Sequence, residues 1–450
     1  MSPPAGIVAP MAGSTGAPSG GGAPGRVIAH VDMDAYFVEV ELLERPELRG
    51  RKLIVAQESG RSVVLSASYE ARADGVRSAM PLARARRLSP EALVLPPHQG
   101  RYREISASIM AFFGEVTDAV EQLSVDEAFL DITGARRRLG DPEEIGRHLR
   151  AETRARFGLP CSVGIADRKF IAKIASTRAK PDGLLLVPPR RRLAFLHSLP
   201  VRALWGVGAK TAEALERLGI TTVEQLAETP AEMLRARFGA IGDQLHALAR
   251  GEDDRGVQTS REEKSLGAEE TFAEDVDSRQ ELLAELLRLS HRVASRLRAG
   301  GHAAGRVGLK LRYRDFETLT RSVTLRHSTQ SALVLHRQAA GLLDGLGVLA
   351  QPVRLIGLRA EALSGDDAGL QLSFDRTETN WIDAEEALDA VAARYPGGVA
   401  PASLLRRPTS RRGGAPDGAG AESGREPGAG PGTEPGAGPG TEPGEERDHG

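Results

Sequence analysis

Hydrophobic positions along the chain recur at two spacings, every second residue and every third to fourth, so both strands and helices are expected. The β-branched run at 27–31 predicts a buried strand with Asp32 at or just beyond its end, and the runs at 52–56 and 62–66 predict two more. Apolar residues at helical spacing predict an amphipathic helix over 101–117. Further strands are predicted at 121–123, 128–132 and 161–165, with helices at 143–157 and 168–178. This pattern indicates a two-layer α+β domain.

The pattern changes in the second half of the chain. Residues 190–250 have the spacing of short helices separated by turns. Beyond Ser265 we predict a helix at 278–298, strands at 306–313, 318–325 and 353–360, and an apolar-periodic helix within 381–405. Residues 1–25 and 406–450 are rich in Gly and Pro and carry too little apolar surface to offset the entropy of ordering. The predicted fold class is therefore α+β multidomain with disordered termini.

Charge is distributed unevenly along the 450 residues. Lys and Arg total 59 against 61 Asp and Glu, yet residues 288–360 hold 13 basic and three acidic side chains. A basic, strand-rich module is typical of a protein that binds a phosphate backbone, although a solvated charged face is the alternative. The single Cys161 excludes an internal disulfide and multi-cysteine metal sites. No apolar run is long enough to cross a bilayer, and we expect a cytoplasmic protein.

Two acidic segments interrupt strand-forming runs. Asp32-Met33-Asp34 follows the first strand, and Asp126-Glu127 lies between two others. Carboxylates that meet at strand ends repel one another unless a cation neutralises them, and Mg²⁺ prefers such oxygen ligands. Either segment alone is more often a solvated turn. Together they predict a site for two Mg²⁺ ions that catalyses phosphoryl transfer.

Five segments of the chain resemble, in order, the signature motifs of Y-family DNA polymerases of the bacterial DNA polymerase IV (DinB) type. They are HVDMDAYFVEVE at 30–41, VLSASYEARADGVRSAMP at 64–81, LSVDEAFLDIT at 123–133, SVGIADRKFIAKIASTRAKPDG at 162–183 and LWGVGAKTAEALERLGI at 204–220. The resemblance covers about residues 26–375. It implies a right-hand polymerase with a palm, small fingers, a helical thumb and an α/β little-finger domain.

The resemblance also implies the domain limits and the activity. The expected divisions are a leader at 1–25, a palm at 26–35 and 97–189, fingers at 36–96, a thumb at 190–262, a little finger at 263–376, a short helical extension at 377–405 and a tail at 406–450. The implied activity is low-fidelity, template-directed addition of deoxynucleotides to a primer, including translesion synthesis. The expected partners are primer–template DNA and dNTPs, and the expected oligomeric state is a monomer.

Family roles carry over to particular residues at the catalytic centre. The resemblance implies that Asp32, Asp126 and Glu127, with the backbone carbonyl of Met33, bind two Mg²⁺ ions. Asp34 is a weaker candidate, for which a turn or a supporting hydrogen bond is the favoured interpretation.

The resemblance further implies which residues contact the nucleotide. Phe37 corresponds to the steric gate, an aromatic ring that excludes a ribose 2′-hydroxyl, and core packing is its alternative. Tyr69, Arg72 and Lys180 correspond to residues that contact the triphosphate, and Ser66 adds a possible hydroxyl contact.

Contacts to DNA and to a protein partner are the least specific expectations. Gly206 and Gly208 resemble the hairpin of a helix-hairpin-helix, which approaches a phosphate through backbone N–H groups. On the little finger we select Arg312, Arg314 and Arg326 from the strand pattern. The segment Gln371, Leu372, Ser373 and Phe374 resembles a β-sliding-clamp peptide, with a terminal edge strand as the alternative.

Two other classes of function remain open from the sequence. The chain could be a non-catalytic DNA- and clamp-binding protein that recruits other factors, although it retains all three carboxylates. It could also be a helix-hairpin-helix nuclease, which would cut DNA in the absence of dNTPs.

Overall fold

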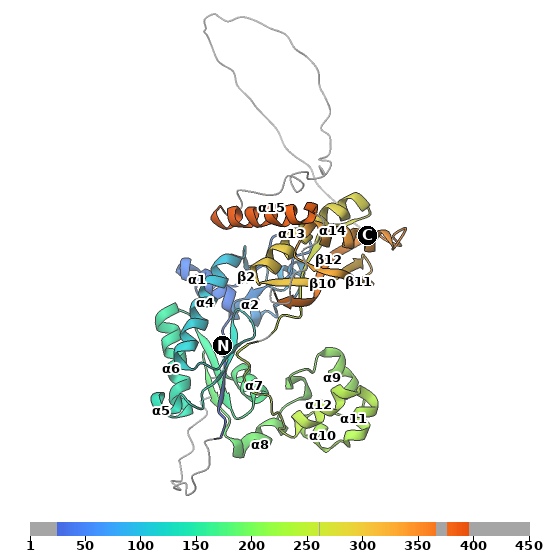
Figure 1. The fold of residues 1–450 in the computed structure, drawn as a ribbon. Helices are drawn as coiled ribbons and strands as arrows, with labels where there is room; N and C mark the ends of the chain where they lie inside the picture. The colour runs from blue at the N-terminus through green and yellow to red at the C-terminus, as the bar shows by residue number, and fades with distance from the viewer. Residues whose placement is uncertain (1–24, 261, 366–375, 396–450) are drawn as a thin grey trace, which may run out of the picture. The chain divides into compact units, whose positions relative to one another are not determined.

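The computed structural model describes residues 25–260, 262–365 and 376–395 (Figure 1). The first sheet has five strands in the order β5-β6-β1-β7-β8, and its central strand β1 (Ile28–Met33) pairs antiparallel with both β6 and β7. The other strands are β5 (Val120–Gln122), β6 (Glu127–Asp131), β7 (Cys161–Ala166) and β8 (Leu184–Leu186). The strands predicted around Asp32 and Asp126 are thus neighbours in one sheet, although almost 100 residues separate them.

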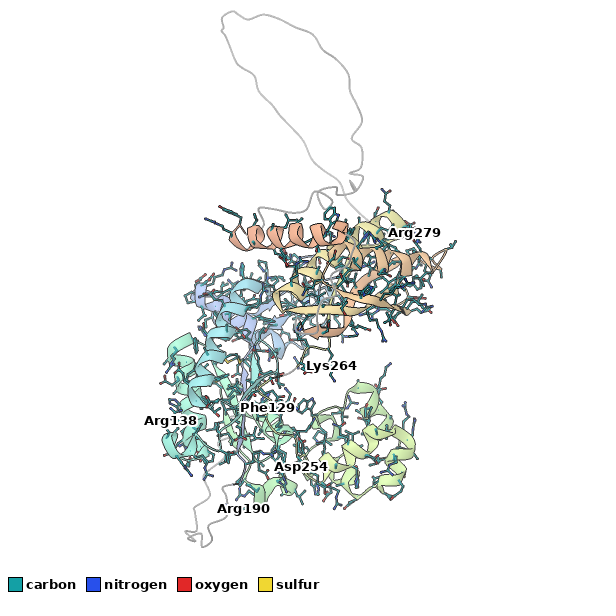
Figure 2. The ribbon with its side chains drawn as sticks, in the orientation of Figure 1. Phe129, Arg138, Arg190, Asp254, Lys264 and Arg279 are labelled. Carbon is teal, nitrogen blue, oxygen red and sulfur yellow. The ribbon has the colours of Figure 1, made fainter. Side chains whose placement is uncertain are left out.

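Helices cover both faces of this sheet. Helices α4 (Gln99–Val116) and α6 (Pro142–Phe157) pack on the face that carries Ala29, Val31 and Met33. Helix α7 (Lys169–Ala179) packs on the opposite face, where Ile28 and Phe129 join its core (Figure 2). Because successive strand residues point to opposite faces, His30 and Asp32 lie on the side covered by α7.

A glycine permits the close approach of α7. Gly164 of β7 is paired with His30 in the register, and a Cβ atom placed on it would lie 2.1 Å from the carbonyl oxygen of Ala172 and 2.2 Å from the amide nitrogen of Ser176. The backbone of α7 therefore lies directly against β7, where no side chain could fit.

A smaller sheet follows β1 along the chain. Helix α1 (Tyr36–Glu44) leads through the short turn η1 (Pro46–Leu48) to strands in the order β3-β2-β4, with two more helices beside them. These elements are β2 (Leu53–Val55), β3 (Ser66–Ala67), β4 (Leu93–Leu95), α2 (Tyr69–Ala73) and α3 (Leu82–Leu88). The strand predicted at 62–66 was wrong, because Val63 makes only an isolated bridge to Pro81, and regular pairing begins at Ser66.

Short helices occupy the predicted helical region after β8 and share a core with α7. They are α8 (Arg192–His197), α9 (Ala209–Glu216), α10 (Val223–Glu228), α11 (Ala231–Phe238) and α12 (Ala240–Ala249), with the turns η2 (Pro189–Arg191) and η3 (Val201–Ala203); α5 (Arg136–Leu139) precedes α6. Gly206 has a φ of 97°, and Gly208 is the N-cap of α9. The left-handed backbone at Gly206 explains a glycine at that turn.

The last sheet is antiparallel, with the order β11-β10-β12-β9, and helices cover one of its faces. Its elements are β9 (Ser265–Val276), α13 (Arg279–Ala299), β10 (His302–Tyr313), β11 (Thr318–Thr329), α14 (Ala332–Asp344) and β12 (Val353–Gly365). Strand β9 was not predicted from the sequence. Its residues are mostly exposed or half-buried, so the chain shows no apolar run there.

The helix expected within 381–405 begins earlier, as α15 (Arg376–Arg394). It is attached by a buried carboxylate. Glu385 accepts hydrogen bonds from Arg298 and from the backbone N–H of Ala332, the first residue of α14, and Asp389 also pairs with Arg298. Glu385 thereby satisfies a backbone donor at a helix start whose own N-cap side chain makes no such bond. None of the helices in the described residues is long and apolar enough to cross a membrane.

Candidate active site at the carboxylate strand ends

Strand pairing brings the two acidic segments together. Asp32 and Glu127 are direct partners in the register of β1 and β6, and the backbone N–H of Met33 donates to the carbonyl oxygen of Asp126 at 2.9 Å. Asp32 lies one residue inside the end of β1, slightly earlier than the sequence suggested. A pair of carboxylates at one sheet edge is the geometry required for a shared cation.

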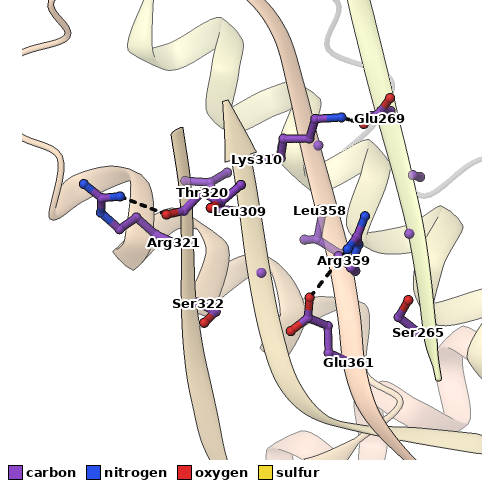
Figure 3. Close-up of a pocket in the computed structure, with 14 residues that line it drawn as sticks. Ser265, Glu269, Leu309, Lys310, Thr320, Arg321, Ser322, Leu358, Arg359 and Glu361 are labelled. Carbon is purple, nitrogen blue, oxygen red and sulfur yellow. Dashed lines mark hydrogen bonds and ion pairs between the residues drawn. The ribbon is translucent and has the colours of Figure 1, made fainter. Parts of the chain in front are cut away.

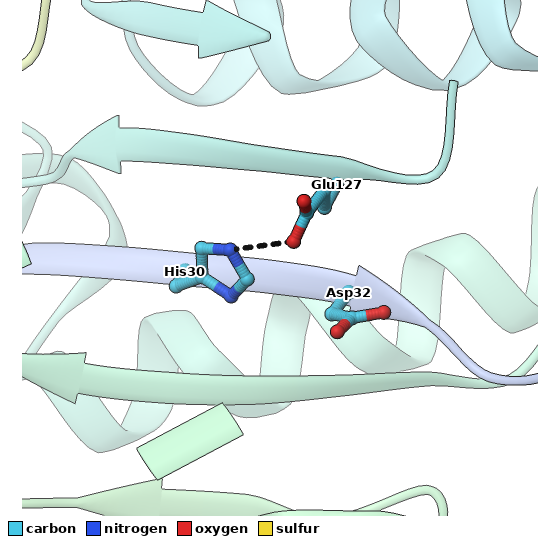
Figure 4. A group of neighbouring side chains, drawn as sticks. All are labelled: His30, Asp32 and Glu127. Carbon is cyan, nitrogen blue, oxygen red and sulfur yellow. Dashed lines mark ion pairs between the residues drawn. The ribbon is translucent and has the colours of Figure 1, made fainter. Parts of the chain in front are cut away.

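Three candidate ligand groups converge on the face covered by α7. Nitrogen or oxygen atoms of His30, Asp32 and Glu127 all lie within 4.8 Å of one another (Figure 4). The carboxylate of Asp126 is not in this group, and it accepts a hydrogen bond of 2.6 Å from the Ser124 hydroxyl. The structure therefore brings together two of the three predicted metal-binding carboxylates and adds a histidine.

Two lysines neutralise part of this charge. The ammonium group of Lys180 donates to Asp32 at 2.6 Å and lies 3.4 Å from the carbonyl oxygen of Met33. The ammonium group of Lys173 donates to Glu127. Burial still raises the pKa of Asp32 to about 6, and the charges of Asp126 and Glu127 add to the rise despite Lys180. A divalent cation bound between these carboxylates would favour their ionised forms.

The pKa shifts of His30 and Glu127 point to different protonation states of the imidazole. A hydrogen bond with His30, and then the contact with Lys173, lower the pKa of Glu127 to about 2, which favours a charged imidazole. Burial instead lowers the pKa of His30 to about 4. We take the imidazole as neutral at neutral pH, because its ring is fully buried and also close to two ammonium groups. Lys173 then supplies the proton shared with Glu127.

Two of the predicted triphosphate residues contact the first acidic segment: Lys180 pairs with Asp32, and Tyr69 bonds to Asp34. The Tyr69 hydroxyl donates to Asp34 at 3.1 Å, and the guanidinium carbon of Arg72 lies 4.9 Å from the centre of the Tyr69 ring. Ser66 is the first residue of β3 and is almost fully buried. Lys180, already paired with Asp32, completes the group.

Asp34 is not positioned as an open ligand. Its side chain is 1% exposed and accepts hydrogen bonds from Tyr69, from the Ser162 hydroxyl and from the backbone N–H of Asp182. These contacts match the interpretation of Asp34 as a supporting residue, since its oxygens already hold three donors.

Comparison with known proteins gives the family. The impB/mucB/samB family model matches residues 31–177, its C-terminal domain matches 263–374, and the model of the DNA polymerase-iota thumb domain matches 202–253. DNA polymerase IV of Desulfatibacillum aliphaticivorans is 42% identical over 84% of this chain and 97% of its own length. DNA polymerase IV of Alkalilimnicola ehrlichii is 44% identical over 75% of this chain and 95% of its own.

A solved Y-family DNA polymerase chimera of Dbh and Dpo4 has a TM-score of 0.69 and 26% identity, covering 75% of this chain and 99% of the chimera. This chain belongs to the Y family of DNA polymerases, of the DNA polymerase IV type. The predicted α+β polymerase fold and the predicted enzyme class, a DNA-directed DNA polymerase, are confirmed.

In this polymerase the proposed steric gate, Phe37, lies in the first turn of α1. Its ring packs on the Tyr102 ring with centroids 4.5 Å apart, and the Tyr102 hydroxyl donates to buried Glu41 at 2.6 Å. The neighbouring Tyr36 is buried and donates to the carbonyl oxygen of Tyr102. Tyr36 is thus the core residue, and Phe37 is half-buried with a fixed aromatic support.

The face of the last sheet opposite its helices carries several basic side chains of the polymerase. Arg312 donates to Thr318 across this face, Arg326 is exposed on β11, and Arg314 lies in the exposed turn after β10. The face contains a hollow of about 670 Å³ (Figure 3). Sequence analysis missed three further cations on the same face, Arg306, Lys310 and Arg359, which the two-residue alternation along the strands could have shown.

Sequence analysis also missed residues on α7. Lys173 and Ser176 are three residues apart and therefore share one side of the helix, while Lys180, which was predicted, is its extended C-cap. That spacing, together with the position of His30 two residues before Asp32, was a usable signal. The proposed clamp peptide, 371–374, lies outside the described residues, as do residues 1–24 of the predicted leader, the end of the predicted extension from residue 396, and the whole predicted tail at 406–450.

Proposed function

We propose that this polymerase extends primers by two-metal phosphoryl transfer with Mg²⁺. Asp32, Asp126 and Glu127, with the carbonyl of Met33, would hold the cations. The observation that supports this most strongly is the pairing of Asp32 with Glu127 in the register of β1 and β6, next to Lys180. Bound Mg²⁺ would activate the primer 3′-hydroxyl and neutralise the leaving pyrophosphate.

The chain's own residues then have distinct tasks. The ammonium group of Lys180 now pairs with Asp32 and would pair with an incoming triphosphate instead. Arg72, which lies beside Tyr69, would donate two hydrogen bonds to phosphate oxygens. Phe37, whose ring is backed by Tyr102, would be the rigid ring that excludes a ribose 2′-hydroxyl. The partners proposed are therefore primer–template DNA and dNTPs.

Primer extension with the double variant Asp126→Ala and Glu127→Ala tests the metal site. Extension should vanish while duplex binding persists, because the lost groups bind cations rather than DNA. Extension at the wild-type rate would overturn the proposed site. A matched reaction without dNTPs should show no cleavage of the DNA.

Phe37→Ala tests the steric gate. The variant should incorporate ribonucleotides far more readily than the wild type, since nothing then fills the space beneath the sugar. Unchanged discrimination between dNTPs and rNTPs would show that the assignment is wrong.

We further propose low-fidelity synthesis past damaged bases. The sheet after β1 has strands of only two or three residues, and such a small fingers module encloses a base pair loosely. Primer extension on matched damaged and undamaged templates tests this. Comparable synthesis on both supports bypass, and complete arrest at the lesion contradicts it.

The domain divisions at 36, 97, 190, 263 and 377 and docking of 371–374 on the β clamp also remain proposals. Deleting 371–374 should spare distributive synthesis but abolish stimulation by the clamp. Equal stimulation of the wild type and the deletion variant by the clamp would contradict the clamp proposal. The monomeric state and the cytoplasmic location stay predictions.

A further inference from the structure

A closed ring of hydrogen bonds joins Glu127 to helix α7, and Lys173 takes part in it twice. The Ser176 hydroxyl donates to the main-chain carbonyl of Lys173 at 2.8 Å, and its oxygen lies 2.7 Å from His30 Nδ1. On the other side of the imidazole, His30 Nε2 lies 3.5 Å from the Lys173 ammonium and 3.2 Å from Glu127 Oε2. The same ammonium donates to Glu127 Oε2, which closes the ring.

The direction of these bonds follows from counting protons. A serine hydroxyl has one proton, and Ser176 gives it to the carbonyl of Lys173. His30 Nδ1 must therefore carry the proton in its contact with Ser176. This assignment fixes the ring so that Nε2 faces Glu127 and Lys173. In the neutral ring Nε2 is an acceptor that faces the Lys173 ammonium, and Lys173 in turn donates to Glu127 Oε2.

The ring holds Glu127 by one oxygen. Both His30 and Lys173 contact Oε2, and Oε1 has no hydrogen-bond partner among the residues that the structure describes. The two-residue alternation of β1 places Asp32 on the same side of the sheet as His30. Oε1 is thus the atom left to bind a cation shared with Asp32.

The surroundings give His30 little freedom. Its side chain is fully buried, and its ring packs edge-on against Phe129 with centroids 4.6 Å apart. Gly164 is its partner in the register and lets the backbone of α7 approach, which brings Ser176 within reach. A carboxylate ligand oriented by buried partners binds a metal without first losing side-chain entropy.

We propose that His30 and Ser176 are positioning residues for the metal-binding carboxylate, holding Lys173 and Glu127 Oε2 so that Oε1 faces the divalent cation. The inference rests on the proposed role of Glu127 as a metal ligand. It assigns a task to a buried histidine that makes no contact with DNA or nucleotide in the proposed function.

Binding of Mn²⁺ to the full chain tests the proposal without turnover. The chain is mixed with primer–template ending in a 3′-dideoxy nucleotide and with the matching dNTP, and free Mn²⁺ is followed by electron paramagnetic resonance. His30→Leu removes both ring nitrogens and should weaken binding about 10- to 100-fold, as expected when a partner of a ligand is lost. Ser176→Ala should weaken it a few-fold.

His30→Gln and Ser290→Ala serve as the matched variants. Glutamine places an amide near the former Nε2 and should recover part of the affinity. Ser290 is a buried serine on α13 that bonds to its own helix, so Ser290→Ala should bind Mn²⁺ as the wild type does. In turnover assays His30→Leu should lower kcat, with little change in the KM for dNTP, and excess Mg²⁺ should restore the rate.

The outcomes separate this inference from the proposed function. If Glu127→Ala leaves Mn²⁺ binding unchanged, the proposed metal site fails. If Glu127→Ala weakens binding while His30→Leu and Ser176→Ala bind as the wild type, the positioning role alone is overturned. Should His30→Leu fail to fold, as judged by its melting curve in EDTA, wild-type affinity in Ser176→Ala by itself refutes the proposal.

Discussion

Two sheet faces of this polymerase carry mixed charges, and they differ in how those charges are held. Beneath α7, each cation contacts a particular carboxylate, and the side chains of His30 and Asp34 are almost fully buried. On the outer face of the β11-β10-β12-β9 sheet, Arg312 and Lys310 are half-buried and pair with exposed neighbours, Lys310 with Glu269 (Figure 3). The first face can hold particular atoms in fixed positions. The second suits binding that does not depend on DNA sequence.

The largest expected effect is loss of a single charge beneath α7. Glu127→Gln keeps the shape of the side chain but removes an anionic ligand, and kcat for primer extension should fall roughly a thousandfold, the several kcal/mol that metal stabilisation contributes. Glu232→Gln, on the exposed part of α11, is the control. If kcat falls less than tenfold in Glu127→Gln, the charges beneath α7 are no more critical to activity than exposed ones, which contradicts the comparison of the two faces.

A methyl group added to a central strand should lower the free energy of unfolding on the buried face and leave it almost unchanged on the outer face. In Gly164→Ala the new Cβ meets the backbone of α7, and the free energy of unfolding should drop by about 1–3 kcal/mol, as in overpacked cores. In Gly308→Ala, on the outer face, the nearest atom is 3.7 Å away, so little change is expected. Urea unfolding of both variants gives the comparison, and equal stability would contradict it.

Acidification should affect the buried face first. Metal binding needs ionised Asp32, whose pKa is raised to about 6 by burial, so the Mn²⁺ affinity should be full above pH 6 and fall up to tenfold per unit below it. Because the folded-state pKa lies above the unfolded value of 3.8, the metal-free protein gains stability from this group as pH falls through 6. Asp32→Asn should abolish both trends.

The smallest effect is expected on the outer face. Arg312→Ala should weaken duplex binding a few-fold and reduce the slope of log affinity against log salt by about 1, because one phosphate contact is lost. Arg292→Ala, exposed on α13 across the sheet, should leave the slope unchanged. An identical slope in all three proteins would show that this face does not contact the backbone.

Local patterns predicted much of the catalytic sheet. The run at 27–31, the helices at 101–117 and 143–157 and the basic strands after 300 were each found close to their expected places. Strand β9 was not predicted, because its exposed, acidic residues lack an apolar pattern. The strand at 62–66 was predicted wrongly, because a β-branched run does not show whether a pairing partner exists.

The sequence by itself determined which residues can share a face: alternation along β1 placed His30 with Asp32, and helical spacing placed Lys173 with Ser176. Only the tertiary structure decided that these two faces meet. Register between strands a hundred residues apart brought Glu127 opposite Asp32, and Gly164 admitted α7 against the sheet. Periodicity is a property of neighbours along the chain, whereas the distance between two elements is set by long-range packing.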